Sequence, residues 1–101
     1  MEGFLPVDDF LAQLQMGHAK IAFGQGRFPD AEKAYRAVHQ SHPDAAAAPE
    51  ARYWEGVSAY KATNDAKHLG RTGVDLKTRY PDSEWARKAS VWLGGQQATQ
   101  P

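Results

Sequence analysis

The chain has no cysteine among its 101 residues, and this absence excludes several kinds of site at once. Disulfide bridges, thiolate nucleophiles and cysteine-based zinc sites are all ruled out, although either redox compartment is compatible with the composition. An excess of one charge is missing too, because 12 Lys and Arg residues balance 12 Asp and Glu residues. Without a net field to concentrate phosphates or anionic lipid, we expect no nucleic-acid partner.

Long hydrophobic runs are also missing. Uncharged stretches such as residues 10–19 contain Gln, Gly and His, and none approaches the roughly 20 apolar residues that a membrane span requires. The first six residues, Met-Glu-Gly-Phe-Leu-Pro, show neither a basic region nor an apolar export segment. We therefore expect no membrane insertion and a cytoplasmic location, with the periplasm as the alternative.

An internal repeat with an offset of 38 residues is the strongest pattern that the sequence does contain. His42-Pro43-Asp44 is matched by Tyr80-Pro81-Asp82, and Trp54 is matched by Trp92. The other pairs at this offset are Val38 with Leu76, Ala48 with Ala86, Ala51 with Ala89 and Gly56 with Gly94. A fixed period of this kind is typical of stacked helical units that bury their apolar faces against one another. The repeat therefore predicts a helical binding module.

Hydrophobic spacing and capping residues predict five helices and no strand. The first helix carries two apolar arcs on nearly opposite sides, at 100° per residue. These arcs are Val7, Phe10, Leu11, Leu14, His18 and Ile21 on one side, and Ala12, Met16, Ala19 and Phe23 on the other. Two such faces predict two packing partners, or one partner and one exposed binding face.

Glycines and prolines set the predicted boundaries. Gly24-Gln25-Gly26 ends the first helix, and Pro29 opens the second. Gly70 and Gly73 weaken the fourth helix, and Gly94-Gly95 ends the fifth. The predicted helices span about 7–24, 28–42, 46–62, 65–80 and 83–94. We expect a single domain over 1–101, with repeat 1 at about 8–43, repeat 2 at about 46–81, a capping helix at 83–94 and a disordered tail at 95–101.

The repeat unit resembles the tetratricopeptide repeat (TPR) family. Ala31 and Tyr35 followed by Pro43 are similar to the family's small, aromatic and proline positions. Tyr53-Trp54-Glu55-Gly56 followed by Tyr60 resembles the first-helix half, in the form found in bacterial Tol-associated and outer-membrane-assembly proteins. This subtype is what keeps the periplasm open as a location. The resemblance implies an all-α, right-handed α-α superhelix of two TPR-like hairpins closed by a capping helix.

The resemblance has limits, and a second one competes with it. The unit is longer than the family's usual length, and Leu69 and Gly73 stand where a small residue and an aromatic residue are expected. Residues 3–14 resemble the closing helix of a thioredoxin-like domain. That resemblance implies an alternative function, in which the chain is the C-terminal tail of a thioredoxin-like redox enzyme and docks a client or a subunit.

No residue set in the sequence predicts catalysis. His39-x2-His42 has the spacing that places two rings on one helix face, but no third ligand except Asp44 is near them in sequence, and two His residues at a helix end also favour the dipole. Asp8-Asp9 is a helix-start pair, and Gly24-Gln25-Gly26 follows no strand. We therefore expect no enzyme activity, no cofactor and no metal.

The TPR resemblance implies a concave face that binds a peptide or a partner helix. It places Gln13, Met16, Lys20 and Phe23 there from the first helix, and Tyr53, Val57, Tyr60 and Lys61 from the third. Met and aromatic residues flanked by Lys suit an apolar peptide with some acidic character. The alternative is that Met16, Phe23, Tyr53 and Tyr60 only pack the two helices together.

Two further expectations concern partners. TPR domains that clamp a C-terminal carboxylate carry Lys and Asn one turn apart on the first helix, whereas this register holds Met16 and Lys20. The carboxylate clamp is therefore not expected. If the outward side of the last helix stays apolar, Trp85, Trp92 and Leu93 predict a homo-oligomer through that helix.

Overall fold

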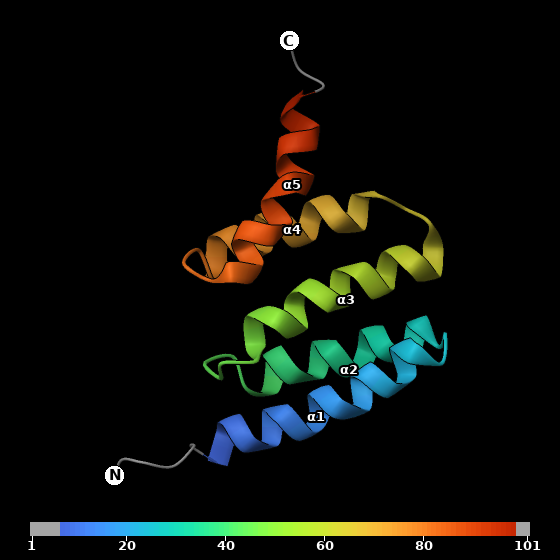
Figure 1. Ribbon diagram of the computed structural model, residues 1–101, viewed down its shortest axis with the longest axis vertical. Coiled ribbons are helices and arrows are strands. Elements are labelled where there is room, and N and C mark those ends of the chain that lie inside the picture. The colour runs from blue at the N-terminus through green and yellow to red at the C-terminus, as the bar shows by residue number, and fades with distance from the viewer. Residues whose placement is uncertain (1–6, 99–101) are drawn as a thin grey trace.

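The computed structural model describes residues 7–98, with the backbone alone for Asp8 and for residues 94–98. Its five elements are all helices (Figure 1). They are α1 (Val7–Gly24), α2 (Phe28–Ser41), α3 (Ala48–Thr63), α4 (Lys67–Arg79) and α5 (Glu84–Ala98). No strand occurs in the described range, which confirms the predicted all-α class. None of the described helices is both long enough and apolar enough to cross a bilayer.

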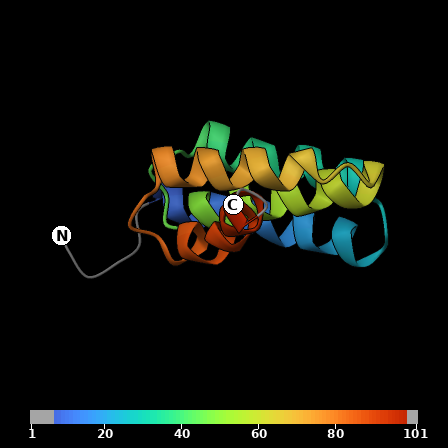
Figure 2. The ribbon, with the colours of Figure 1, turned by 90° about the horizontal axis from the view of Figure 1, so that it is seen from above.

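The helices form an elongated stack in chain order, measuring 52 × 30 × 17 Å. Figure 1 shows α1 at one end, α2, α3 and α4 following it, and α5 projecting at the other end. Seen from above, α2 and α4 lie on one side of the stack, and α1, α3 and α5 lie toward the other (Figure 2). Helices α1 and α2 form a hairpin because only three residues separate them.

The 38-residue offset is visible in the local geometry. His42 and Tyr80 cap α2 and α4 with φ/ψ of −133°/61° and −135°/57°. The backbone N–H of His42 donates to Val38 O at 2.9 Å, and that of Tyr80 donates to Leu76 O at 2.8 Å. Three of the matched pairs are also buried alike, namely Val38 with Leu76, Ala48 with Ala86 and Ala51 with Ala89. The sequence repeat is therefore a repeat of backbone conformation and burial.

Two glycines allow the helices of the second half to approach closely. A Cβ atom on Gly56 would lie 1.8 Å from Thr72 Oγ1, so α4 packs on α3 only because this position has no side chain. A Cβ atom on Gly73 would lie 3.1 Å from Ala89 O and 3.2 Å from Leu93 Cγ. Gly73, which departs from the family pattern, therefore makes room for α5.

Most predicted boundaries lie within two residues of the observed ones, and Gly26 has the expected positive φ, 80°. Helix α3 starts at Ala48, not near residue 46, because Ala45 and Ala47 are buried in turns against the first hairpin. The predicted end at Gly94-Gly95 is wrong, since α5 continues to Ala98. Glycine lowers helix propensity by about 1 kcal/mol but does not by itself stop a helix. The end of the predicted tail, residues 99–101, lies outside the described residues.

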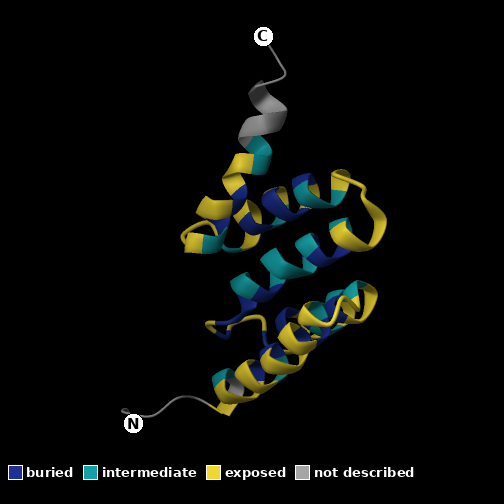
Figure 3. Ribbon diagram, turned by 45° about the vertical axis from the view of Figure 1, so that its right-hand side comes forward, coloured by how far each residue is buried: buried dark blue, intermediate teal, exposed yellow. Residues whose placement is uncertain are grey.

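Of the two predicted apolar arcs of α1, one is buried and the other is exposed. Ala12, Met16 and Ala19 are fully buried against the rest of the hairpin, with Phe23 partly buried beside them. The opposite arc is exposed, and Figure 3 shows exposed residues recurring along the whole of α1. Only one of the two apolar faces therefore finds a packing partner within the described chain.

Candidate functional site

An open groove of about 360 Å³ lies on the side of the stack that carries α1, α3 and α5. Four helices contribute to it, which places side chains that are far apart in sequence around one space. Its lining residues are Lys20, Phe23 and Gly24 from α1, Tyr35 from α2, Glu50 and Trp54 from α3, and Trp85 from α5. We call this space the aromatic groove.

The aromatic rings around the groove contact one another in an unbroken series. Phe23 packs edge-to-face against Trp54, with ring centroids 5.5 Å apart, and Trp54 packs in the same way against Tyr53 at 5.3 Å. Tyr53 in turn lies 5.0 Å from both Trp85 and Trp92, and its ring is stacked on Trp92. Such contacts stabilise each pair by about 1 kcal/mol beyond burial and restrict ring motion. The walls of the groove are therefore held in place before any ligand binds.

The lining of the groove includes one cation, Lys20, and one anion, Glu50. Lys20 Nζ lies 3.8 Å from Glu50 Oε2, a long contact between side chains that are 56% and 24% exposed. Tyr35 is almost fully buried, and burial, followed by the negative charge of Glu50, raises its pKa to about 12. The Tyr35 hydroxyl therefore stays protonated at neutral pH. The groove combines apolar walls with one hydroxyl and one weak ion pair.

The structure places the predicted site residues of α1 differently from one another. Lys20 and Phe23 line the aromatic groove. Gln13 is exposed, and it does not line the groove. Met16 is fully buried in the core, where α1 packs chiefly against α2. It is therefore not exposed for binding, and its role differs from the alternative interpretation, which had it pack the first helix on the third.

None of the predicted residues of α3 lines the groove. Tyr53 joins the aromatic series behind the wall formed by Trp54 and Trp85. Val57 and Tyr60 are half-buried, and Lys61 Nζ lies 5.7 Å from the centroid of the Phe28 ring. Sequence reasoning did not assign the lining residues Gly24, Tyr35, Glu50, Trp54 and Trp85 to this site. The repeat held a signal for Trp85, because it makes the last helix equivalent to α3 and therefore part of the same layer.

The apolar side of α5 faces inward. Trp85 and Trp92 pack on Tyr53, and Leu93 lies against Gly73 of α4. All three residues are half-buried, so they are not the fully outward-facing surface that the sequence analysis considered, and a homo-oligomer through α5 stays a prediction. The large apolar side chain that α5 does expose is Val91, which is 67% accessible.

The opposite side of α3 carries a network of ion pairs centred on Glu55. Arg36 Nε donates to Glu55 Oε2 at 2.9 Å, and His39 Nε2 lies 2.5 Å from Glu55 Oε1. Arg52 Nη1 is 3.6 Å from the same carboxylate. Burial alone would raise the pKa of Glu55, but the bonds from His39 and Arg36 and the charge of Arg52 outweigh it and hold the pKa below its ordinary value. The groups around this carboxylate therefore hold it in its ionised form, and none of them is left to exchange a proton with a substrate.

The network continues into α4. Arg52 Nε donates to Asp75 Oδ2 at 2.6 Å, and Arg79 Nη1 donates to the same oxygen at 3.2 Å. His39, which the sequence analysis considered with His42 as a pair of metal ligands, forms a hydrogen bond with Glu55. Within the described residues no group of three or more His, Asp or Glu side chains is placed to hold a metal ion. The paired charges of this network join α2, α3 and α4, so the network has the chemistry of helix packing.

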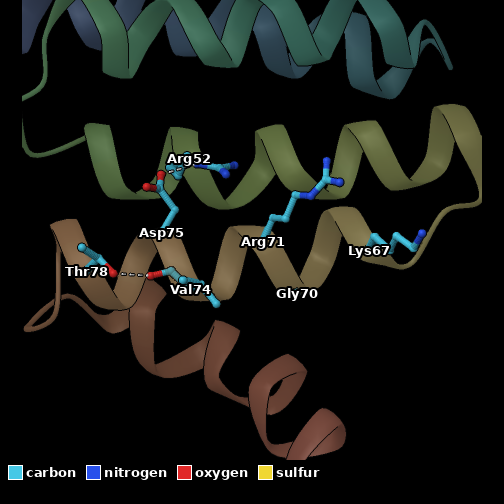
Figure 4. Close-up of a pocket in the computed structure, with 7 residues that line it drawn as sticks. All are labelled: Arg52, Lys67, Gly70, Arg71, Val74, Asp75 and Thr78. Carbon is cyan, nitrogen blue, oxygen red and sulfur yellow. Dashed lines mark hydrogen bonds and ion pairs between the residues drawn. The ribbon is translucent and has the colours of Figure 1, made fainter.

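A larger and more open recess of about 650 Å³ lies on the surface shared by α3 and α4. Figure 4 shows its lining, with Arg52 from α3 bonded to Asp75 and the Thr78 hydroxyl bonded to the Val74 carbonyl. The remaining lining residues are Lys67, Gly70 and Arg71. It has no aromatic wall and no nucleophile paired with a base, and Arg52 and Asp75 cancel each other's charge. The smaller aromatic groove is the better candidate site.

Comparisons of the chain with protein-family models, with curated proteins and with solved structures found no match. The TPR relationship therefore stays a prediction from the residues that suggested it. The function has to be argued from the chemistry of the aromatic groove.

Proposed function

We propose that this chain is a noncatalytic protein-interaction module that binds a peptide or a partner helix in the aromatic groove. The observation that carries the proposal is the groove's construction, in which Phe23, Trp54 and Trp85 converge from three helices around about 360 Å³ of open space. Aromatic side chains in fixed positions around a recess are the usual anchors of protein recognition.

The lining predicts the chemistry of the ligand. The aromatic walls suit one large apolar side chain as the anchor, since burying such a side chain contributes about 1.5–3 kcal/mol. Lys20 at the rim suits a carboxylate next to that anchor, and the protonated Tyr35 hydroxyl offers one hydrogen bond. The proposed ligand is therefore an apolar segment with an acidic flank.

The noncatalytic part of the proposal is supported by the state of the titratable groups. Glu55 accepts from several donors, Asp75 from two arginines, and Tyr35 has a pKa of about 12. None of these groups pairs a nucleophile with a base that is able to receive its proton at neutral pH.

A displayed library of random 12-residue peptides, panned against the full chain, tests the proposal. We expect selected peptides to share a large apolar residue beside Asp or Glu and to bind with micromolar affinity in fluorescence anisotropy. Trp85→Ala should lower that affinity at least tenfold. The matched control is Trp92→Ala, which also removes a ring from Tyr53 but lies outside the groove lining.

A charge reversal supplies a second readout. Lys20→Glu should select against acidic peptides, whereas Lys33→Glu, on the exposed surface of α2, should not. If selected peptides bind both tryptophan variants equally, the groove is not the binding site. If no peptide is enriched over an unrelated helical protein, the proposal is wrong.

The second candidate function is the docking tail of a thioredoxin-like enzyme. The observation that favours it is the exposure of Val7, Phe10 and Leu14 on α1, because a helix that closes another domain needs an apolar outer face. The remainder of that resemblance, residues 3–6, lies outside the described residues. Reading the gene upstream of Met1 tests this function. A strand-rich domain with Cys-x-x-Cys or its remnant would support it, and a stop codon in frame would exclude it.

A further inference from the structure

The outer face of α1 is the largest apolar surface that the described chain leaves without a packing partner. Val7 is 72% exposed, Phe10 55%, Leu14 52% and Ile21 57%. At 100° per residue they lie on the side of α1 opposite the buried residues Ala12, Met16 and Ala19. Leu11, which is 42% exposed, lies beside them. Five large apolar side chains on one exposed helix face are unusual for an isolated monomer, and such patches mark interaction sites.

These residues follow a coiled-coil spacing. Positions 7, 10, 14, 17, 21 and 24 are separated alternately by three and four residues, which is the seam of a heptad repeat. Val7, Leu14 and Ile21 occupy one set of seam positions, and Phe10, Gly17 and Gly24 occupy the other. An apolar line of this kind on an exposed helix is suited to a second helix lying along it.

The sizes of the seam residues are complementary under a two-fold rotation. When α1 is placed antiparallel to a second copy of itself about its midpoint, Val7 faces Gly24, Leu14 faces Gly17 and Phe10 faces Ile21. In two of these three layers a large side chain meets a glycine. A Cβ atom added at Gly17 or Gly24 would have no heavy atom within 4 Å, so both positions are open to a side chain from outside.

A parallel pair does not have this property. It would set Gly17 against Gly17 and Gly24 against Gly24, leaving two layers empty, while Phe10 would crowd Phe10. The antiparallel pair also aligns the two helix dipoles favourably. Among pairings of α1 with itself, only the antiparallel one fills every layer.

Charge and position are compatible with this pairing. None of the six seam residues is charged, and the chain has no net charge, so two copies do not repel each other over distance. Helix α1 forms one end of the stack, and no other described helix lies beyond it (Figure 1). We infer that the outer face of α1 is a dimer interface, in which two copies of this chain pair α1 with α1 in antiparallel orientation.

Light scattering coupled to size exclusion measures the first consequence. At about 50 μM the full chain should have twice the protomer mass of 11.1 kDa, and dilution should lower that mass. Leu14→Glu should give a monomer at the same concentration. Leu14 is 52% exposed, so the variant should keep its helical circular dichroism. The matched control is Val91→Glu on α5, which should remain a dimer.

Cross-linking tests the orientation, and the absence of native cysteine makes single-cysteine variants unambiguous. A mixture of Phe10→Cys and Ile21→Cys chains should be joined by a short bifunctional maleimide. Each variant alone should cross-link poorly, because in the antiparallel pair the two copies of either position lie eleven residues apart, about 16 Å along the helix.

The interface and its orientation are contradicted by different results. A monomer at all concentrations, or a dimer that survives Leu14→Glu, overturns the interface. Efficient cross-linking of each cysteine variant with itself overturns the antiparallel arrangement. If Leu14→Glu does not fold, the cross-linking pattern in the otherwise unchanged chain still decides the question. The peptide-binding groove is tested by other residues, so that proposal and the dimer fail independently. The second candidate function uses the same face of α1, so a dimer through this face would exclude the docking of another domain there.

Discussion

On one side of α3 lies a series of aromatic rings, and on the other lies a network of ion pairs. Trp54 and Tyr53 face Phe23, Trp85 and Trp92, and no charge takes part in those contacts. On the opposite side Glu55 and Arg52 bind charged residues of α2 and α4. A single helix therefore joins its neighbours by two different kinds of interaction.

The two sides of α3 therefore suit different roles, the ion-pair side helix packing and the aromatic side ligand binding. Ion pairs and hydrogen bonds require a fixed geometry, so the network sets how α2, α3 and α4 lie against one another, and its charges are then used up. Aromatic rings are less directional and leave an open groove with apolar walls. The aromatic side is thus the one that can accept a ligand without leaving a charge unpaired.

The largest expected effect comes from the close approach of α3 and α4 on the ion-pair side. Gly56→Ala should lower the free energy of unfolding by about 3 kcal/mol, because the new Cβ would lie 1.8 Å from Thr72 Oγ1 and force the helices apart. Urea denaturation measures the change. Gly24→Ala is the control, since its Cβ would meet nothing within 4 Å of the same chain. Measured at a concentration at which the chain is monomeric, it should change stability by less than about 1 kcal/mol. Equal effects would show that Gly56 is not a packing constraint.

Removing the central charge of the network should have the next largest effect. Glu55→Gln removes the carboxylate partner of His39 and one of the two carboxylates that Arg36 and Arg52 each contact, while Glu32 and Asp75 remain. We expect a loss of about 2 kcal/mol at pH 7, because the site is half-buried. Thermal unfolding monitored by circular dichroism measures it. A variant as stable as the native chain would mean that the network contributes nothing net.

The same variant predicts a pH dependence with a definite sign. The pKa of Glu55 is lowered from 4.5 in the folded state, so its contribution is fully present above about pH 4.5 and is lost as the pH falls through the folded value. The stability difference between the native chain and Glu55→Gln should therefore shrink below pH 4.5. A difference that stays constant down to pH 3 would contradict the lowered pKa.

The aromatic side should respond to mutation but not to salt. Trp92→Leu removes the ring stacked on Tyr53 and should lower stability by about 1–2 kcal/mol. The loss should be the same in 0.05 M and 1 M NaCl, whereas the loss caused by Glu55→Gln should shrink in 1 M NaCl because salt screens partly exposed charges. A common salt dependence would remove the distinction between the two sides.

The smallest effect is expected at the rim of the groove. Lys20→Ala breaks an exposed 3.8 Å ion pair with Glu50, which should change stability by less than about 0.5 kcal/mol. Its effect should appear in binding, as a weaker preference for acidic peptides. A large loss of stability would show that Lys20 is a structural residue.

The sequence predicted the helices well because its signals are local. The boundaries are marked by residues that act through their own backbone dihedrals, and they do so in any context. These residues are Gly26, Pro29, Pro43 and Pro81. The end of α5 was missed because Gly94-Gly95 has a weak propensity effect and no obligatory stop. The start of α3 lies two residues after the predicted one, because burial of Ala45 and Ala47 depends on α1 and α2, which a local pattern does not contain.

The candidate site was predicted in part for the same reason. The TPR resemblance predicted which side of α1 faces the binding surface. Lys20 and Phe23 were assigned to that side, and both line the groove. Met16 shares their spacing, but its side of α1 is turned fully into the core. Tyr35 and Trp85 come from α2 and α5, so their presence depends on how four helices meet.

By itself, then, the sequence determined the all-α class, the 38-residue repeat and the two apolar faces of α1, since these follow from composition, periodicity and backbone preference along one segment. Tertiary structure alone decided which face of α1 is buried, why Gly56 and Gly73 are needed and which rings surround the groove. The physical reason is that helix formation depends on neighbours in the chain, whereas burial and grooves depend on neighbours in space.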